Sequence, residues 1–374
     1  MPQIRTIRLK APTSDLYVSW ARFAERHPQA SFFQSEAFVR LIETWPEAEG
    51  VLVVALDGSG NITGSLLGVL ICETPGRLWQ KSRLKRIHRK LTSRAVVYGG
   101  PLLGQDPRQQ QPTLRALLLA LHREVKHRAL FTQFRNFFDL SGFRTVFEGE
   151  GYRYNDRLNL LPGTSSAETA WKGITSNRRR QVRKSLEAGA VVVTEPSARQ
   201  VDEFYAILRT LYARKVKKPL PSPTFFHALH ALGPGPANNH PPPGTGSGYA
   251  KLLLVIYENR VAGGAACVML PGRAMHEWYG CGLDREYKKA GIYPSVLATW
   301  ASIEYAAKNG IPVFDFMGMG RPEIPYGVRE FKKEFGGSWV NFGRFSRVNR
   351  AVPYFITETA YNGFLFLSRL VNYK

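Results

Sequence analysis

The segment from Asp315 to Gly337 holds the side chains whose chemistry is most specific in this sequence. When an amine attacks an activated carbonyl, the transition state carries an oxyanion, and a fixed cation beside that oxygen lowers the barrier. Lys332 is the candidate cation. Asp315 could assist in removing a proton, although its position at a strand end favours a structural hydrogen-bonding role. Without further context, Lys332 would be an ordinary helix lysine and Phe331 a core residue.

Clustered cations are the second chemical feature. Five cations precede the first acid, Glu187, in a predicted helix: Arg178, Arg179, Arg180, Arg183 and Lys184. Such a cluster either contacts the phosphates of a tRNA or a nucleotide precursor, or forms a solvated polar face. A second run, 77–94, has eight Lys or Arg residues with apolar residues between them, which suits lipid headgroups or RNA.

The elements that would position these residues occur in a repeated order. Strands are expected at 251–257, 261–270 and 273–281, followed by a helix at 294–309 and a strand at 313–316. The first half has a similar order, with strands up to about Gly104, a helix to Arg128 and a strand at 131–134. This order is consistent with a tandem duplication.

Cap residues, Gly and Pro mark the other helices and loops. Further helices are expected at 35–45, 177–188 and 201–215. Prolines at 219, 221 and 223 predict an extended segment, and the composition of 233–248 predicts a loop.

Composition limits the class of protein. A chain of 374 residues favours two domains. We place them at 1–160 and 161–374, and leave open a return of the segment from about 338 to the first domain. A formal charge of +22 implies a polyanionic partner, unless it only reflects a solvated basic surface.

Three separated cysteines, no apolar leader and no spanning apolar run predict a cytoplasmic protein. Contact with the inner membrane surface remains open. No metal-ligand spacing, Ser-His-Asp order or P-loop occurs, so neither a metal nor a cofactor is expected. His276 and Glu277 are expected on opposite faces of a strand, as packing or surface residues.

The segment that ends at Gly337 resembles the signature of the FemABX family, within the GNAT-like acyltransferases. The matching residues are Gly327, Phe331, Lys332, Phe335, Gly336 and Gly337. Ser31-Phe-Phe-Gln-Ser35, the basic helix from Asn177 and the residues around Phe314-Asp315-Phe316 are also similar to that family. The resemblance covers most of the chain beyond Ser31, and implies an α/β protein with two tandem GNAT-like domains, each a mixed sheet flanked by helices.

The resemblance also implies a reaction. FemABX enzymes add amino acids from aminoacyl-tRNA to UDP- or lipid-linked muropeptides, and no cofactor is needed because the ester donor is already activated. It places Lys332 and Phe331 at the donor ester. Thr210-Leu-Tyr-Ala-Arg214 resembles a segment that contacts acceptor phosphates, with one extra residue in its spacing. The substrate-binding candidates are therefore Arg214, Tyr212, Arg178, Arg179, Arg183 and Tyr326.

Two alternatives remain open. One is an acyl-CoA-dependent N-acyltransferase that acts on a cell-envelope sugar or an amino acid. GNAT enzymes of that kind hold the pyrophosphate on a Gly-rich loop, but Lys288-Lys-Ala-Gly-Ile-Tyr293 has Tyr293 where a small residue belongs, which disfavours coenzyme A. The other alternative is a non-catalytic protein that binds RNA or a membrane surface.

Overall fold

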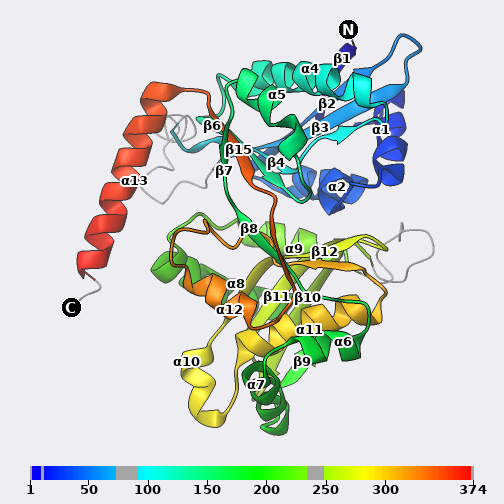
Figure 1. The fold of residues 1–374 in the computed structure, drawn as a ribbon. Helices are drawn as coiled ribbons and strands as arrows, with labels where there is room; N and C mark the ends of the chain where they lie inside the picture. The colour runs from blue at the N-terminus through cyan, green and yellow to red at the C-terminus, as the bar shows by residue number, and fades with distance from the viewer. Residues whose placement is uncertain (1, 10–11, 73–90, 234–247, 372–374) are drawn as a thin grey trace. The chain divides into compact units, whose positions relative to one another are not determined.

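The chain forms two compact units in the computed structural model, which describes residues 2–9, 12–72, 91–233 and 248–371 (Figure 1). Unit 1 comprises Met1–Asn155 and Gly343–Lys374, and unit 2 comprises Asp156–Phe342. The division lies close to the expected boundary at 160. The chain returns to unit 1 from Gly343 rather than from 338.

Unit 1 is built on one mixed sheet. Within the described residues its order is β1-β2-β3-β4-β6-β15-β7, and β5 pairs with β3. The strands are β1 (Gln3–Leu9), β2 (Ala48–Leu56), β3 (Ile62–Ile71), β4 (Arg94–Gly99), β5 (Leu102–Leu103), β6 (Phe131–Asn136), β7 (Arg153–Asn155) and β15 (Arg344–Val348). The helices are α1 (Asp15–Arg26), α2 (Glu36–Thr44), α4 (Pro107–Val125), α5 (Arg144–Gly149) and α13 (Ala351–Val371).

The centre of this sheet is apolar on both faces. Every residue of β2 from Gly50 to Leu56 is buried, so its side chains require cover on each side. Helices α4 and α2 pack on β2, and α1 packs on β3. The helix expected at 35–45 is α2, and Ser35 caps it, because the Ser35 Oγ accepts from the Phe38 amide. Helix α4 begins at Pro107, because the Asp106 side chain caps it and the first helical position tolerates Pro.

Unit 2 has a five-stranded sheet, ordered β13-β12-β11-β10-β9, and a separate β14-β8 pair. Its strands are β8 (Leu158–Leu161), β9 (Val191–Val193), β10 (Ala250–Tyr257), β11 (Arg260–Leu270), β12 (Ala274–Gly282), β13 (Val313–Asp315) and β14 (Ser338–Asn341). The helices are α6 (Ala167–Gly173), α7 (Ser176–Glu187), α8 (Ala198–Leu211), α9 (Pro223–Ala231), α10 (Asp284–Tyr287), α11 (Pro294–Lys308) and α12 (Gly327–Lys333).

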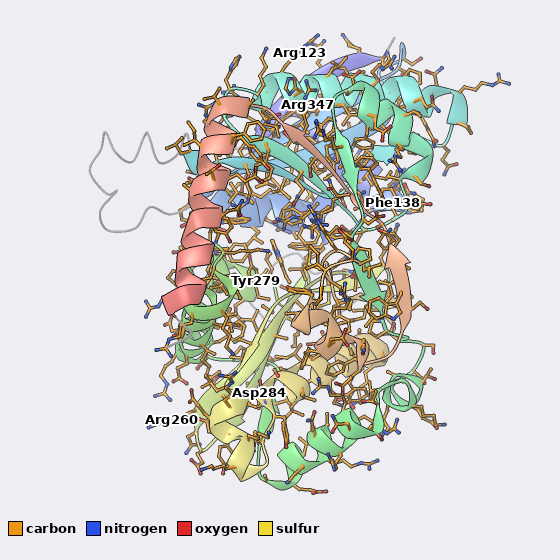
Figure 2. The ribbon with its side chains drawn as sticks, turned by 60° about the vertical axis from the view of Figure 1, so that its left-hand side comes forward. Arg123, Phe138, Arg260, Tyr279, Asp284 and Arg347 are labelled. Carbon is orange, nitrogen blue, oxygen red and sulfur yellow. The ribbon has the colours of Figure 1, made fainter. Side chains whose placement is uncertain are left out.

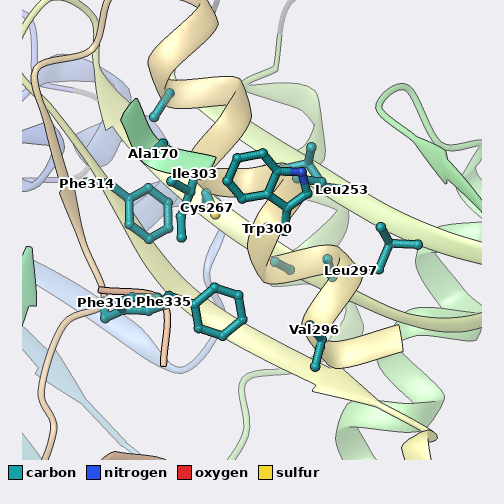
Figure 3. Close-up of a cluster of buried hydrophobic side chains, with 14 of the residues drawn as sticks. Ala170, Leu253, Cys267, Val296, Leu297, Trp300, Ile303, Phe314, Phe316 and Phe335 are labelled. Carbon is teal, nitrogen blue, oxygen red and sulfur yellow. The ribbon is translucent and has the colours of Figure 1, made fainter. Parts of the chain in front are cut away.

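Helix α11 lies across this sheet and closes its core. It contacts β10, β11 and β12, and its Trp300, Leu297 and Ile303 are buried with Phe314 and Phe316 (Figure 3). Helix α8 also packs on β11 and β12. The predicted extended segment ends earlier than expected, since Pro223 starts helix α9 instead of blocking it.

The two units share one connection order. Three antiparallel strands, β2-β3-β4, precede α4 and then β6, which is parallel to β4. In unit 2, β10-β11-β12 precede α11 and then β13, which is parallel to β12. This repetition is the order that the sequence pattern predicted. None of the helices in the described part of the chain has the length and apolar composition needed to span a membrane.

Candidate functional site

Strands β12 and β13 separate in the middle of unit 2. They are paired only over Ala274–His276 with Val313–Asp315, whereas β12 continues to Gly282. After Asp315 the chain bonds to β8 instead: the Phe316 amide donates to Leu160 O at 3.2 Å, and the Met319 amide to Leu158 O at 2.7 Å. The parallel ladder therefore opens at the His276–Asp315 pair.

A β-bulge in β12 follows this point at once. Cys267 of β11 faces Glu277, while Ala266 faces Tyr279, so Trp278 is an extra residue on β12. Glu277 is only 8% exposed and shares its face of the sheet with buried apolar residues. Its Oε1 accepts a hydrogen bond of 3.1 Å from the Thr299 hydroxyl on α11. Glu277 was expected to be a packing or surface residue; it is buried, and its hydrogen bond with Thr299 was not predicted.

Lys332 of α12 reaches the place where the strands separate. The residue as a whole is half-buried, and its ammonium donates to Phe316 O at 2.6 Å and lies 5.4 Å from the centroid of the Phe316 ring. Because an ammonium has three donors, this contact leaves donor capacity for a further acceptor. Phe331, the preceding residue, packs against the buried cluster around Trp300.

Two buried carboxylates act on the charge of Lys332. Burial lowers the pKa of Lys332, and the charges of Glu277 and Asp315 oppose that shift. Burial raises the pKa of Glu277, opposed by Lys332 and by the Thr299 hydrogen bond. The site is thus a cation beside two acids within an apolar surround, where electrostatic interactions are stronger than in water.

Asp315 is held by its neighbours on both oxygens. Asn159 Nδ2 lies 3.0 and 2.8 Å from Oδ1 and Oδ2, and the Met317 amide donates to Oδ1 at 2.6 Å. Burial raises the pKa of Asp315 to about 6, although these hydrogen bonds and Lys332 oppose the shift. Met317 has φ 57°, an uncommon value for a residue with a side chain, which the bond to Asp315 supports. This arrangement suits the structural role favoured for Asp315.

Arg178 of α7 holds the helix that carries Lys332. Its guanidinium lies 4.6 Å from the Phe331 centroid and 5.6 Å from that of Phe335, and its Nε forms an ion pair with Glu334 at 3.4 Å. Arg178 is 9% exposed, so it is a buried structural cation more than an open phosphate ligand. Its part in positioning Lys332 was not foreseen.

We expect Arg178→Met to destabilise unit 2 by about 2 kcal/mol, because Glu334 would lose its cation and two aromatic rings their partner. Urea unfolding measures this change. Arg180→Met is the matched control, since Arg180 is exposed on the same helix and contacts Asn177; it should change stability by less than about 0.5 kcal/mol. Equal losses of stability for the two substitutions would contradict a structural role for Arg178.

The other arginines of α7 also have local partners. Arg179 Nη1 donates to the carbonyls of Trp171, Lys172 and Ile174 at the end of α6, the closest at 2.7 Å. Arg183 is exposed and lies 5.4 Å from the Trp171 ring. Their contact with phosphates stays a prediction. Of the basic run 77–94, residues 77–90 lie outside the described part, as does most of the predicted loop 233–248.

The predicted acceptor residues lie on a turn of π-helix that extends α8, at Tyr212–Val216. Arg214 is exposed, and Tyr212 is half-buried with its ring 6.3 Å from that of Tyr279, a residue of β12 after the bulge (Figure 2). This contact brings Tyr212 to the strand that carries Glu277. Tyr326 is 41% exposed at the start of α12.

The turn before α11, which is the nearest counterpart of a pyrophosphate loop, already has its amides engaged. The Tyr293 amide donates to Ser185 Oγ at 2.9 Å, and Pro294 has no N–H. The next amide, that of Ser295, donates to the carboxylate of Asp284 at 3.2 Å (Figure 2). An acidic side chain therefore lies where a bound anion would be stabilised by the helix N-terminus. Within the described residues no group of His, Cys, Asp and Glu is arranged to hold a metal ion.

Comparisons with a protein family and with solved structures show which fold this chain has. Residues 175–333 match the family model described as "Acetyltransferase (GNAT) domain". The chain is similar in structure to FemX, with a TM-score of 0.61 and 12% identity over 94% of this chain and 99% of that one. It is also similar to a tandem GNAT protein from the clavulanic acid biosynthesis pathway, with a TM-score of 0.53 and 15% identity over 93% of this chain and 99% of that one. No curated protein matches the sequence. The predicted fold of two GNAT-like domains is confirmed.

Proposed function

We propose that this chain, an acyltransferase with a GNAT domain and the FemX fold, transfers an aminoacyl group from aminoacyl-tRNA to an amine of a UDP- or lipid-linked muropeptide. The observation that carries the proposal is Lys332 at the separation of β12 and β13, within the Phe-Lys and Phe-Gly-Gly segment that resembles the FemABX signature. The reaction would serve cell-envelope biosynthesis.

Lys332 and its two acidic neighbours support this proposal. The carbonyl of the donor ester would lie between the separated strands, beside the Lys332 ammonium. Attack by the amine places negative charge on the carbonyl oxygen, and Lys332 would stabilise it with an N–H that does not bond Phe316 O. Collapse of this intermediate would break the ester C–O bond and leave the amide, and the ribose oxygen of the tRNA would depart as a hydroxyl with the proton that the amine loses. The charges of Glu277 and Asp315 oppose the lowering of the Lys332 pKa by burial, and so favour its cationic form. Because the ester is already activated, the transfer needs no cofactor.

The Asp284 carboxylate favours an aminoacyl ester over a coenzyme A thioester. A pyrophosphate at the start of α11 would meet this negative charge, and the amides of Tyr293 and Ser295 would have to leave Ser185 and Asp284 to bind it. Both the repulsion and the lost hydrogen bonds weaken coenzyme A there. An aminoacyl-tRNA ends in an ester at a ribose and places no pyrophosphate at this turn.

A second candidate is an acyl-CoA-dependent N-acyltransferase on a cell-envelope sugar or amino acid. The family model favours it, since its description names acetyltransferases. It would require coenzyme A to bind elsewhere, or Asp284 to move.

We expect calorimetric titration to show saturable binding of UDP-MurNAc-pentapeptide and no binding of acetyl-CoA. A coenzyme A-dependent GNAT acetyltransferase in the same buffer is the positive control. Transfer of labelled amino acids from a charged tRNA pool to the muropeptide then tests turnover. Saturable acetyl-CoA binding without muropeptide binding would replace the proposal with the second candidate.

A further inference from the structure

Helix α13 of unit 1 exposes a row of apolar side chains. Val352, Phe355 and Ile356 are 71%, 58% and 60% exposed, and their spacing of three and four residues places them on one face of the helix. Large apolar residues gathered on one helix face indicate a surface that something covers.

The opposite side of α13 attaches it to its own unit. The Tyr354 ring meets that of Phe131 edge-on at 5.8 Å, and the Thr357 hydroxyl donates to Leu91 O at 3.3 Å. The exposed row and the attached side therefore belong to different faces. A partner can cover Phe355 and Ile356 without detaching the helix from the sheet.

Positive charge gathers where α13 begins. The register of β4, β6 and β15 brings the start of β4, the start of β6 and the end of β15 to one end of the sheet. The Leu130 amide donates to Ser93 O and the Arg350 amide to Leu130 O, which joins the adjoining turns. Basic residues at this end are Arg94, Lys126, His127, Arg128 and Arg350. Among them, Arg128 is ion-paired with Glu49.

An apolar row beside a basic cluster fits the surface of an anionic bilayer. A helix of this kind lies in the plane of the interface, with its apolar side chains among the acyl chains and nearby cations at the headgroups. Over its described residues, α13 is not long and apolar enough to cross a membrane. A second copy of the chain is the less favourable occupant, because each copy carries a formal +22 and the two would repel.

We propose that α13 binds the surface of an anionic membrane, with Val352, Phe355 and Ile356 inserted below the headgroups. Lys126 and Arg350 lie near the lipid phosphates and make the binding dependent on anionic lipid. This inference is independent of the proposed donor and acceptor. It would bring the acyltransferase to substrates that are held at a membrane.

Sedimentation of the full chain with vesicles tests the proposal. We expect binding to phosphatidylglycerol–phosphatidylcholine vesicles that weakens at least tenfold on pure phosphatidylcholine or at high salt. Phe355→Ser with Ile356→Ser should weaken binding by roughly tenfold or more, since each side chain loses its apolar burial. Leu186→Ser and Val191→Ser are matched controls in unit 2, at 50% and 58% exposure, and should leave binding unchanged.

Two results would overturn the proposal. One is an absence of binding of the unaltered chain to anionic vesicles. The other is light scattering that shows a dimer for the unaltered chain and a monomer for the double variant, with equal vesicle binding, which would assign the face to a second copy. If the double variant shows no cooperative thermal transition, Val352→Ser in the first turn of α13 replaces it.

Discussion

We expect Lys332→Met to lower turnover by about 100-fold or more, because one donor to an oxyanion usually contributes that much or more. The substitution removes the ammonium that donates to Phe316 O and that lies in the field of Glu277 and Asp315. Methionine keeps a long apolar stem, so the contacts of the aliphatic part are retained. Steady-state transfer of labelled amino acid to the acceptor measures the loss.

Lys333→Met is the matched control. Lys333 is the next residue of α12, is exposed, and forms an ion pair with Glu330 one turn earlier. It should keep turnover within about twofold, since surface pairs of this kind contribute little. A loss below about tenfold for Lys332→Met, with a normal unfolding curve, would exclude the oxyanion role of Lys332.

The largest expected effect on stability is at Gly336, in the same segment. Gly336 has φ 71°, and a Cβ there would lie 2.3 Å from the carbonyl oxygen of Gly173. Gly336→Ala therefore combines a left-handed backbone with a clash against main chain that cannot rotate away. We expect it to destabilise unit 2 by about 3 kcal/mol or more. Urea unfolding followed by circular dichroism measures the change.

Gly327→Ala tests whether this effect is specific to the position. Gly327 starts α12, and a Cβ there would meet no atom within 4 Å. Alanine should leave stability unchanged or raise it by up to about 1 kcal/mol, because it favours helix. If both alanine substitutions lower the free energy of unfolding by similar amounts, the left-handed backbone and the clash at Gly336 are not the cause of the loss.

The sequence predicted well where hydrophobic periodicity and cap residues coincide. Helix α11 was expected at 294–309 and occupies Pro294–Lys308, and β10 and β11 lie within one residue of their predicted bounds. Helix α1 was missed because its polar face interrupts the apolar pattern; only Tyr17, Trp20 and Ala24 are buried. Helix α9 was missed because prolines were interpreted as breakers, whereas Pro223 occupies the first helical position.

Much of the site could not be predicted, because it consists of tertiary contacts that no local sequence pattern contains. Lys332 was found from a motif, and the structure places it where β12 and β13 separate. Glu277 escaped notice because the bulge at Trp278 and the partner Thr299 arise only when β11 and α11 are assembled. Asp284 lies ten residues before Pro294, so its bond to the Ser295 amide depends on how the intervening turn folds.

Strand β15 affects how the chain can fold during synthesis. It joins the sheet of unit 1 between β6 and β7, and its Phe345 ring stacks on Phe147 at 3.9 Å. Residues 156–342 lie between β7 and β15 in the chain, so the ribosome completes unit 2 before it supplies the strand that unit 1 lacks. Until then β6 has an unpaired edge and β7 lacks the strand with which it pairs, and unpaired strand edges are prone to association with other chains. The nascent protein is therefore most vulnerable to aggregation in its first-made half, and chaperone binding should concentrate there.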